Sequence, residues 1–217
     1  MKSNNIKEPQ QKRSIEKKEK IISAAMDLFF TDGYHKTNTA DIAKAAGVST
    51  GIVYRYFPDK KGILMEGLPI VTEAIQHMIF DAFKEKMTPD STLSDFIHFA
   101  VDELLDYHQN SYTAHEQFEL ILYAVPEAMD YLYDLEKEIT MKVASLLPSF
   151  GITLDHPFER VHLVYHMIED LCHEITFHKH KEINPEVLKE LVIEQLISLL
   201  QTSSSTEQSV CSTHSRA

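Results

Sequence analysis

The sequence predicts an all-α protein of about nine helices, and three observations support that fold class. Apolar residues recur at steps of three and four, as in Ile22, Ala25 and Phe29, and no segment alternates apolar and polar residues as a half-buried strand does. Gly and Pro are scarce, with 6 and 8 among 217 residues, which disfavours a turn-rich β protein. The apolar fraction of 43% is enough to form a buried core.

The N-terminal part of the chain predicts short helices with sharp ends. The first helix begins near Ile15 and stops at Gly33. The second is "NTADIAKAAG": Asn38 can cap it, Asp41 lies three residues further on as in a capping box, and Gly47 ends it. A short helix followed at once by glycine is typical of a tight turn between two helices.

A third short helix, "STGIVYRYF", follows directly. Ser49 is its expected cap, and Pro58 breaks the chain after it. The small residues of "AAGVS" let the second and third helices approach closely, as in a helix-turn-helix. We therefore expect a helix-turn-helix domain at residues 15–61, preceded by a flexible basic tail at residues 1–14.

The rest of the chain predicts a second, larger helical domain at residues 62–201. Gly67 and Pro69 should kink its first helix or make it restart. The tail at residues 202–217 is poor in apolar residues and is expected to be disordered. The six helices expected after the helix-turn-helix have approximate bounds 60–86, from the turn at 88–96 to 109, 112–123, 126–147, 158–178 and 185–201.

Charge is divided unevenly along the chain. Residues 1–61 hold 12 Lys and Arg against 7 Asp and Glu, a net charge of +5. Residues 62–217 carry −17, and the two parts sum to the net charge of −12. A basic end on an acidic body is expected when only that end meets a polyanion. A run such as "KRSIEKKEK" can equally be a solvated helix surface, so the charge alone leaves both interpretations open.

The third helix carries the candidate contacts to DNA. The second helix of a helix-turn-helix enters the major groove by its N-terminal residues, which are small or apolar here and fit against base edges: Thr50, Gly51 and Ile52. Donors for phosphates and bases follow them, at Tyr54, Arg55, Tyr56, Lys60 and Lys61.

The segment Ile21–Leu64 resembles the TetR family of bacterial one-component repressors. It follows the family's first helix ending in Gly-Tyr, then its helix-turn-helix in "DIAKAAGVSTG", then "YRYFPDKK". The resemblance implies base or neighbouring phosphate contacts by Thr50, Gly51, Ile52, Arg55 and Tyr56, and phosphate contacts by Tyr54 and Lys60. Ser49 and Asn38 complete the candidate set, although the family usually has Thr in place of Asn38 and an apolar residue in place of Thr39.

The resemblance also implies a homodimer that binds double-stranded operator DNA and pairs through its last two helices. A cytoplasmic repressor, released from a palindromic operator by a small, largely apolar effector, is the expected function. Aromatic and apolar side chains at helical spacing could line the effector pocket, although most such residues simply form core. The candidates are Met78, Phe96, Phe118, Leu122 and Tyr165. A constitutive repressor without an effector is a further possibility.

Other classes of protein find less support. Cys172 and Cys211 make no disulfide framework, the polar N-terminus is no signal peptide, and no apolar run approaches the roughly 20 residues that span a membrane. The chain has no phosphate loop, no "GxSxG" and no CxxC, so we expect no enzyme, no catalytic residue and no cofactor.

The main alternative is a helical metal-binding protein or enzyme that uses the histidine-rich segment 162–180. "HEITFH" is no zinc-protease motif, because His173 and His178 are five residues apart rather than four. A histidine stripe does fall within about 60° on a helical wheel. It can be a solvated face, an interface or pocket, or a metal site, and consists of His162, His166, Glu169, His173 and His180.

Overall fold

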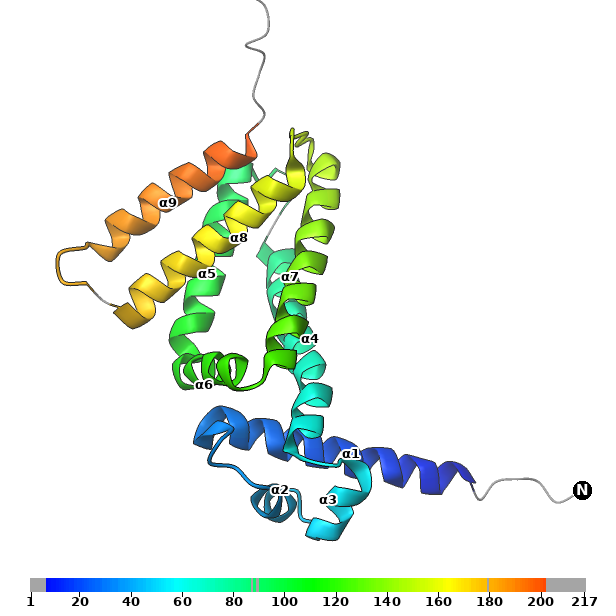
Figure 1. Cartoon of the computed structure of the whole chain (residues 1–217). Helices are drawn as coiled ribbons and strands as arrows, with labels where there is room; N and C mark the ends of the chain where they lie inside the picture. Colours follow the sequence, from blue (N-terminus) through cyan, green and yellow to red (C-terminus); the bar gives the residue numbers. More distant parts are fainter. Residues whose placement is uncertain (1–6, 87, 89, 179, 202–217) are drawn as a thin grey trace, which may run out of the picture. The chain divides into compact units, whose positions relative to one another are not determined.

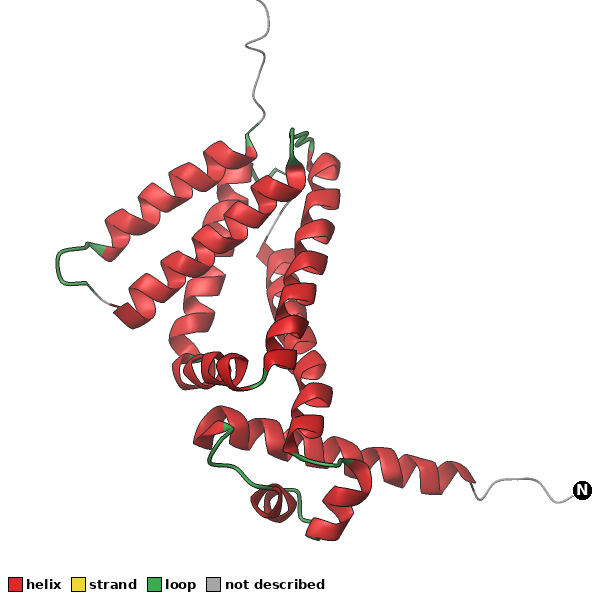
Figure 2. Ribbon diagram, viewed as in Figure 1, coloured by secondary structure: helices red, strands yellow, loops and turns green. Residues whose placement is uncertain are grey.

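The computed structural model describes residues 7–86, 88, 90–178 and 180–201, and in this part of the chain all regular elements are helical (Figures 1 and 2). The predicted fold class is confirmed. The α-helices are α1 (Lys7–Leu28), α2 (Thr39–Ala45), α3 (Thr50–Tyr56), α4 (Lys60–Lys86), α5 (Leu93–Asn110), α6 (Tyr112–Ala124), α7 (Pro126–Leu146), α8 (Pro157–His173) and α9 (Pro185–Leu200). A π-helical turn follows α1 (Phe29–Gly33) and another follows α8 (Glu174–His178).

The first helix is longer than the sequence predicted. It begins at Lys7 rather than near Ile15, so the part of the expected tail from Lys7 onward is helical. The added segment "KEPQQKRS" is rich in Lys, Glu and Gln, which favour helix without needing burial, and the apolar pattern therefore missed it. Residues 1–6 of the expected N-terminal tail and the expected tail at 202–217 lie outside the described residues.

The chain packs into two compact units. The described residues of Met1–Lys86 and Asn110–Tyr133 form the first unit, and those of Met87–Gln109 and Asp134–Ala217 form the second. The first unit is larger than the expected helix-turn-helix domain at 15–61, because α4, α6 and the start of α7 share its core. A functional boundary between residues 61 and 62 stays a prediction.

The core of the first unit joins the helix-turn-helix to α1 and α4. Fully buried side chains come from each of these helices and from the segment after α3, and include Ile21, Phe29, Ile42, Val53, Phe57, Ile63 and Leu64. Farther along the chain, Ile121 and Ala128 are buried in the same core. The three predicted N-terminal helices thus pack into the core of the first unit by their apolar faces.

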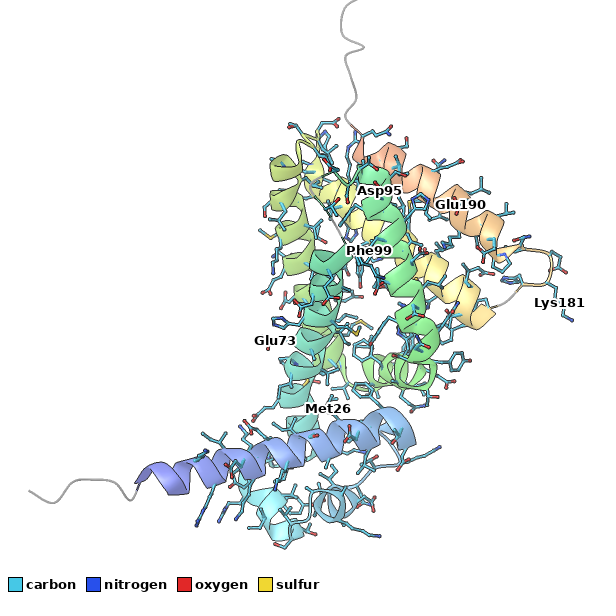
Figure 3. All side chains as sticks on the ribbon, turned by 180° about the vertical axis from the view of Figure 1, so that it is seen from behind. Met26, Glu73, Asp95, Phe99, Lys181 and Glu190 are labelled. Carbon is cyan, nitrogen blue, oxygen red and sulfur yellow. The ribbon has the colours of Figure 1, made fainter. Side chains whose placement is uncertain are left out.

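Gly67 permits a close approach of α4 to α1. A Cβ atom built at Gly67 would overlap the sulfur of Met26 and would lie 2.7 Å from Cγ of Met26 and 3.2 Å from Cγ2 of Ile22 (Met26 is labelled in Figure 3). The expected restart near Pro69 is wrong, since α4 runs unbroken from Lys60 to Lys86 with the proline inside. The buried α4 residues before Pro69 hold the helix in place, and glycine serves packing here rather than a break.

We expect Gly67→Ala to lower the free energy of unfolding by about 1–3 kcal/mol, because the added methyl overpacks the contact with Met26 and Ile22. Chemical denaturation measures the change. Gly51→Ala is the matched control, since nothing lies within 4 Å of a Cβ there and alanine favours helix. If both variants proved equally stable, the α1–α4 contact would not require glycine.

The second unit has its own core, built by α5, the C-terminal part of α7, α8 and α9. Its buried side chains are Ile97, Val101, Ala144, Leu147, Val161, Val164, Ile168, Leu171, Cys172, Ile193, Leu196 and Leu200. Thr92 and Asp95 form a reciprocal cap at the start of α5, where each side chain accepts from the backbone N–H of the other (Asp95 is labelled in Figure 3). Arg160 on α8 donates to the carbonyl of Leu199 at 2.8 Å, which ties α8 to the end of α9.

Candidate nucleic-acid interface

The start of α2 is capped and a glycine turn follows its end, as the sequence predicted. The Asn38 side chain accepts from the N–H groups of Ala40 and Asp41, and Asp41 accepts from the N–H of Asn38, so the capping box is present. Gly47 has a φ of +66°, a left-handed conformation that glycine adopts at little cost. The N–H of Val48 then bonds to the carbonyl of Ala43 at 2.9 Å. These contacts set the angle at which α3 leaves α2.

Helix α3 has one buried face and one exposed face. Val53 is buried in the core of the first unit, while Gly51, Tyr54 and Arg55 are exposed. Ser49 occupies the predicted cap position, but its side chain makes no capping hydrogen bond, so that part of the prediction is wrong. Its exposed hydroxyl is available to a ligand instead.

Thr50 and Ile52 are less exposed to solvent than a role in base contacts suggested. Both are half-buried, and Ile52 packs against the core of the first unit. A substitution of Ile52 would therefore disturb packing as well as any base contact. The exposed candidates for base recognition are Gly51, Tyr54 and Arg55.

Hydrogen bonds hold the two tyrosines of α3. The Tyr54 hydroxyl lies 2.9 Å from Oγ1 of Thr39 on α2, so the polar residue at position 39 links α2 to α3 by a hydrogen bond. The Tyr56 hydroxyl lies 2.9 Å from Oγ of Ser14 on α1, and the Arg55 guanidinium lies 5.3 Å from the centre of the Tyr56 ring. Hydrogen bonds from Ser14 and Arg55 lower the pKa of Tyr56. Both tyrosine rings are thus oriented before any nucleic acid binds.

The Ser14 contact brings the basic part of α1 to the end of α3 (Figure 1). Exposed cations on α1 lie on either side of Ser14, at Lys12, Arg13 and Lys17. Lys17 is close enough to Tyr56 for its charge to lower the tyrosine pKa. Reasoning from the sequence treated "KRSIEKKEK" only as a charged run, and the structure makes its N-terminal part an extension of the candidate interface.

Lys60 has a structural contact that the sequence did not reveal. Its ammonium donates to the carbonyl oxygens of Tyr34 at 2.6 Å and Thr37 at 3.0 Å, and lies 4.3 Å from the centre of the Tyr34 ring. Partial burial lowers the pKa of Lys60. The residue ties the start of α4 to the segment before α2, and a phosphate contact by the same ammonium stays a prediction. Lys61 instead pairs with Glu127 at 2.8 Å.

We expect Lys60→Ala to lower the free energy of unfolding by about 1–3 kcal/mol, because two hydrogen bonds from a charged donor are lost. Lys61→Ala is the control: its exposed ion pair should contribute less than about 1 kcal/mol. Thermal and chemical denaturation of both variants give the comparison. Equal losses would show that the carbonyl contacts of Lys60 add nothing to stability.

The histidine stripe divides among different partners within the second unit. His162 and His166 both approach Glu136 of α7, Glu169 pairs with His108 of α5, and His180 pairs with Glu174. The sequence placed these residues on one helix face but could not show which neighbouring helix each one meets. Glu136 and His108 are the partners that it missed.

His108 is buried beside an acidic side chain. It is 2% exposed, its Nε2 lies 3.3 Å from Oε2 of Glu169, and its Nδ1 lies 2.8 Å from the carbonyl of Leu104. Burial lowers the pKa of His108, but hydrogen bonds with Cys172 and Glu169 and the charge of Glu169 outweigh burial and raise it to about 10. The ring of His173 packs against it, with 5.6 Å between ring centres.

This pKa predicts that the free energy of unfolding falls in alkaline solution. A raised pKa in the folded state adds stability that is complete below the ordinary value of 6.5 and is lost as pH rises through about 10. Urea unfolding across this range should show a flatter pH profile for Glu169→Gln, which removes the charge, than for the native chain. Glu159→Gln, at an exposed position on α8, should keep the native profile. Parallel profiles for all three proteins would contradict a charged His108.

The predicted effector contacts are distributed over both units. In the first, Leu122 is buried and Phe118 half-buried in the core, while Met78 is 51% exposed. In the second, Phe96 is half-buried against the core and Tyr165 is half-buried beside His166, with 5.3 Å between ring centres. The pocket that would combine these residues stays a prediction. Among the described residues, no helix has the length and apolar composition that a membrane span requires.

Comparison with known proteins agrees with the helix-turn-helix. Residues 21–66 match the family model described as bacterial regulatory proteins, tetR family. The chain is 34% identical over 95 residues to the HTH-type transcriptional regulator RutR of Escherichia coli (strain K12), a match that covers 44% of each protein. It is 28% identical over 131 residues to the HTH-type transcriptional regulator BetI of Klebsiella pneumoniae, covering 60% of this chain and 66% of that one. The match thus spans less than half of RutR.

Solved structures resemble the chain over most of its length. A TetR-family transcriptional regulator of Mesorhizobium loti has a TM-score of 0.66 at 18% identity, covering 87% of this chain and 96% of that one. One of Syntrophomonas wolfei has a TM-score of 0.61 at 20% identity, covering 85% and 95%. At these identities the likeness shows the fold alone, and it extends beyond the helix-turn-helix into the later helices.

Proposed function

Because this chain belongs to the tetR family of bacterial regulatory proteins, we propose that it is a transcriptional repressor that binds a palindromic operator through α3. The observation that carries the proposal is the exposed face of α3, with Gly51, Tyr54 and Arg55 at its surface and the cations of α1 beside it. Helix α2 and the turn at Gly47, closed by the hydrogen bond from Val48 to Ala43, orient α3 as a helix that enters the major groove requires. Side chains on such a face read base edges, and the surrounding cations contact phosphates.

A selection from random DNA tests this proposal. The native chain should enrich one roughly palindromic motif. Arg55→Ala should change the preferred base at a few positions, at a cost of about 1–3 kcal/mol per specific contact. Lys44→Ala, which removes the same charge from an exposed position on α2, should weaken all sequences alike and leave the motif unchanged. Failure of the native chain to enrich any motif would refute the repressor proposal.

We also propose a homodimer formed by α8 and α9. Both helices expose large apolar side chains although they bury others in the core: Leu163 is 50% exposed on α8, and Val187 and Leu191 are 55% and 53% exposed on α9. Pairing through the last two helices is also what the resemblance to the family implied. Two copies of the pair would bury these faces in a symmetric four-helix contact.

Sedimentation at micromolar concentration should give about twice the chain mass of 24.9 kDa. A charge at the proposed interface, in Leu163→Glu or Leu191→Glu, should shift the protein toward monomer, because the carboxylate would be buried without a partner. Met141→Glu is the matched control, since Met141 is equally exposed (51%) but lies on α7. A native chain that sediments only as a monomer, or a Met141 variant that dissociates as readily, would count against α8 and α9.

The effector of this repressor is proposed as a small, largely apolar molecule. The support is the aromatic and apolar content of the candidate contacts Met78, Phe96, Phe118, Leu122 and Tyr165, together with the helical domain that the family uses for ligands. A Bacillus subtilis relative named a fatty acid metabolism regulator protein is 34% identical over 83 residues, but that match covers 37% of this chain. It therefore supports the class of regulator rather than a particular ligand, and we propose no catalytic role.

A further inference from the structure

Two histidines and one glutamate of the second unit meet at a single carboxylate oxygen. Nδ1 of His162 lies 2.9 Å from Oε1 of Glu136, and Nε2 of His166 lies 3.0 Å from the same atom. The two imidazole rings are close to each other, with 4.4 Å between their centres. Three potential metal ligands thus converge on one point.

The helices explain this convergence. His162 and His166 are four residues apart on α8, so their side chains lie on the same face one turn apart. Glu136 projects from α7, which packs its last turns into the same core as α8. The carboxylate is largely buried, with its side chain 13% exposed, whereas the two histidine side chains are 53% and 48% exposed. The protein therefore surrounds the cluster on one side and leaves the other side open to solvent.

The spacing suits a divalent metal ion. The ligand atoms of Glu136, His162 and His166 all lie within 4.8 Å of one another. Zinc binds histidine nitrogen at about 2.0–2.1 Å and carboxylate oxygen at about 2.0–2.2 Å, so tetrahedral ligands lie roughly 3.3–3.5 Å apart. The observed 2.9 and 3.0 Å separations need to widen by only a few tenths of an ångström. Side-chain rotation at the exposed rings can supply that movement.

Another histidine cluster in the second unit lacks this convergence. His178 and His180 both pair with Glu174, but they contact different oxygens of the carboxylate, and their ring centres lie 6.1 Å apart. That arrangement is two separate ion pairs. It supplies a matched comparison of the same residue types in the same unit.

We propose that Glu136, His162 and His166 form a binding site for a divalent transition metal of the zinc class. Imidazole nitrogen with one carboxylate suits zinc, whereas magnesium and calcium prefer sets of oxygen ligands. Three protein ligands leave a fourth position, on the solvent side, for water or a donor atom of another molecule. The site is independent of the helix-turn-helix, so it stands or falls separately from the proposed operator binding.

Calorimetric titration of zinc into the full-length chain, freed of metal by a chelator, tests the site. The native chain should bind one zinc ion at this site, and magnesium should produce no binding. Glu136→Gln keeps the size of the side chain but removes its charge, and should weaken zinc at least about tenfold. His166→Ala and the pair His162→Ala with His166→Ala should do the same. The histidine changes lie at exposed positions whereas Glu136 is largely buried, so melting curves of all variants without zinc will show whether the fold is intact.

Two control variants locate the metal. His178→Ala with His180→Ala should bind zinc as the native chain does, because that cluster does not converge. Cys211→Ser with His214→Ala removes two other zinc-binding side chains of the sequence and should also leave the site intact. Native zinc affinity in the folded Glu136 and His166 variants would overturn the proposal, as would absence of zinc binding to the native chain.

Discussion

The close contact between α1 and α4 determines how the first unit is built. Gly67 has no side chain, so Met26 and Ile22 of α1 can lie directly against the α4 backbone. This contact brings the buried residues Ile63 and Leu64 of α4 into the core that also holds α2 and α3. Any bulk added at the contact must push the two helices apart, because a close-packed interior has no free volume to receive it. The position of the helix-turn-helix thus depends on a residue outside it.

Polar contacts orient the side chains of α3 that the core leaves exposed. Lys60, at the start of α4, donates hydrogen bonds to the carbonyls of Tyr34 and Thr37, just before α2. Tyr54 is bonded to α2 and Tyr56 to α1, so the outer face of α3 is held from both neighbours. A surface oriented in advance loses less conformational entropy when it binds. The net charge of −12 comes from residues 62–217, whereas residues 1–61 carry +5, and the fields of exposed charges are screened over about 10 Å.

The sequence predicted local structure well and long-range contacts poorly. Helix ends followed from nearby residues: Asn38 with Asp41, and the prolines that open α7 and α9, act within a few positions of the end that they define. Some local details were nevertheless wrong, namely the start of α1, the cap by Ser49 and the restart at Pro69. What the sequence missed altogether is contacts between residues far apart in the chain. The role of Lys60 depends on carbonyls 26 and 23 residues away, and that of His166 on a glutamate 30 residues away. Periodicity assigns a residue to a face of its helix but does not identify the helix that this face meets.

The histidines of α8 show how strongly the neighbouring helix decides the chemistry. His162 and His166 meet a carboxylate near the surface and keep about half of each side chain in solvent, so either ring can change partner without disturbing the core. Glu169, three residues further along and 25% exposed, meets His108, whose side chain is only 2% exposed. The exposed histidine rings can change ligands at little cost, whereas removal of Glu169 would take away a carboxylate that faces a buried imidazole, which is costly. The histidine stripe of α8 therefore contributes two exposed histidines that face Glu136 of α7 and a glutamate that pairs with the buried His108 of α5.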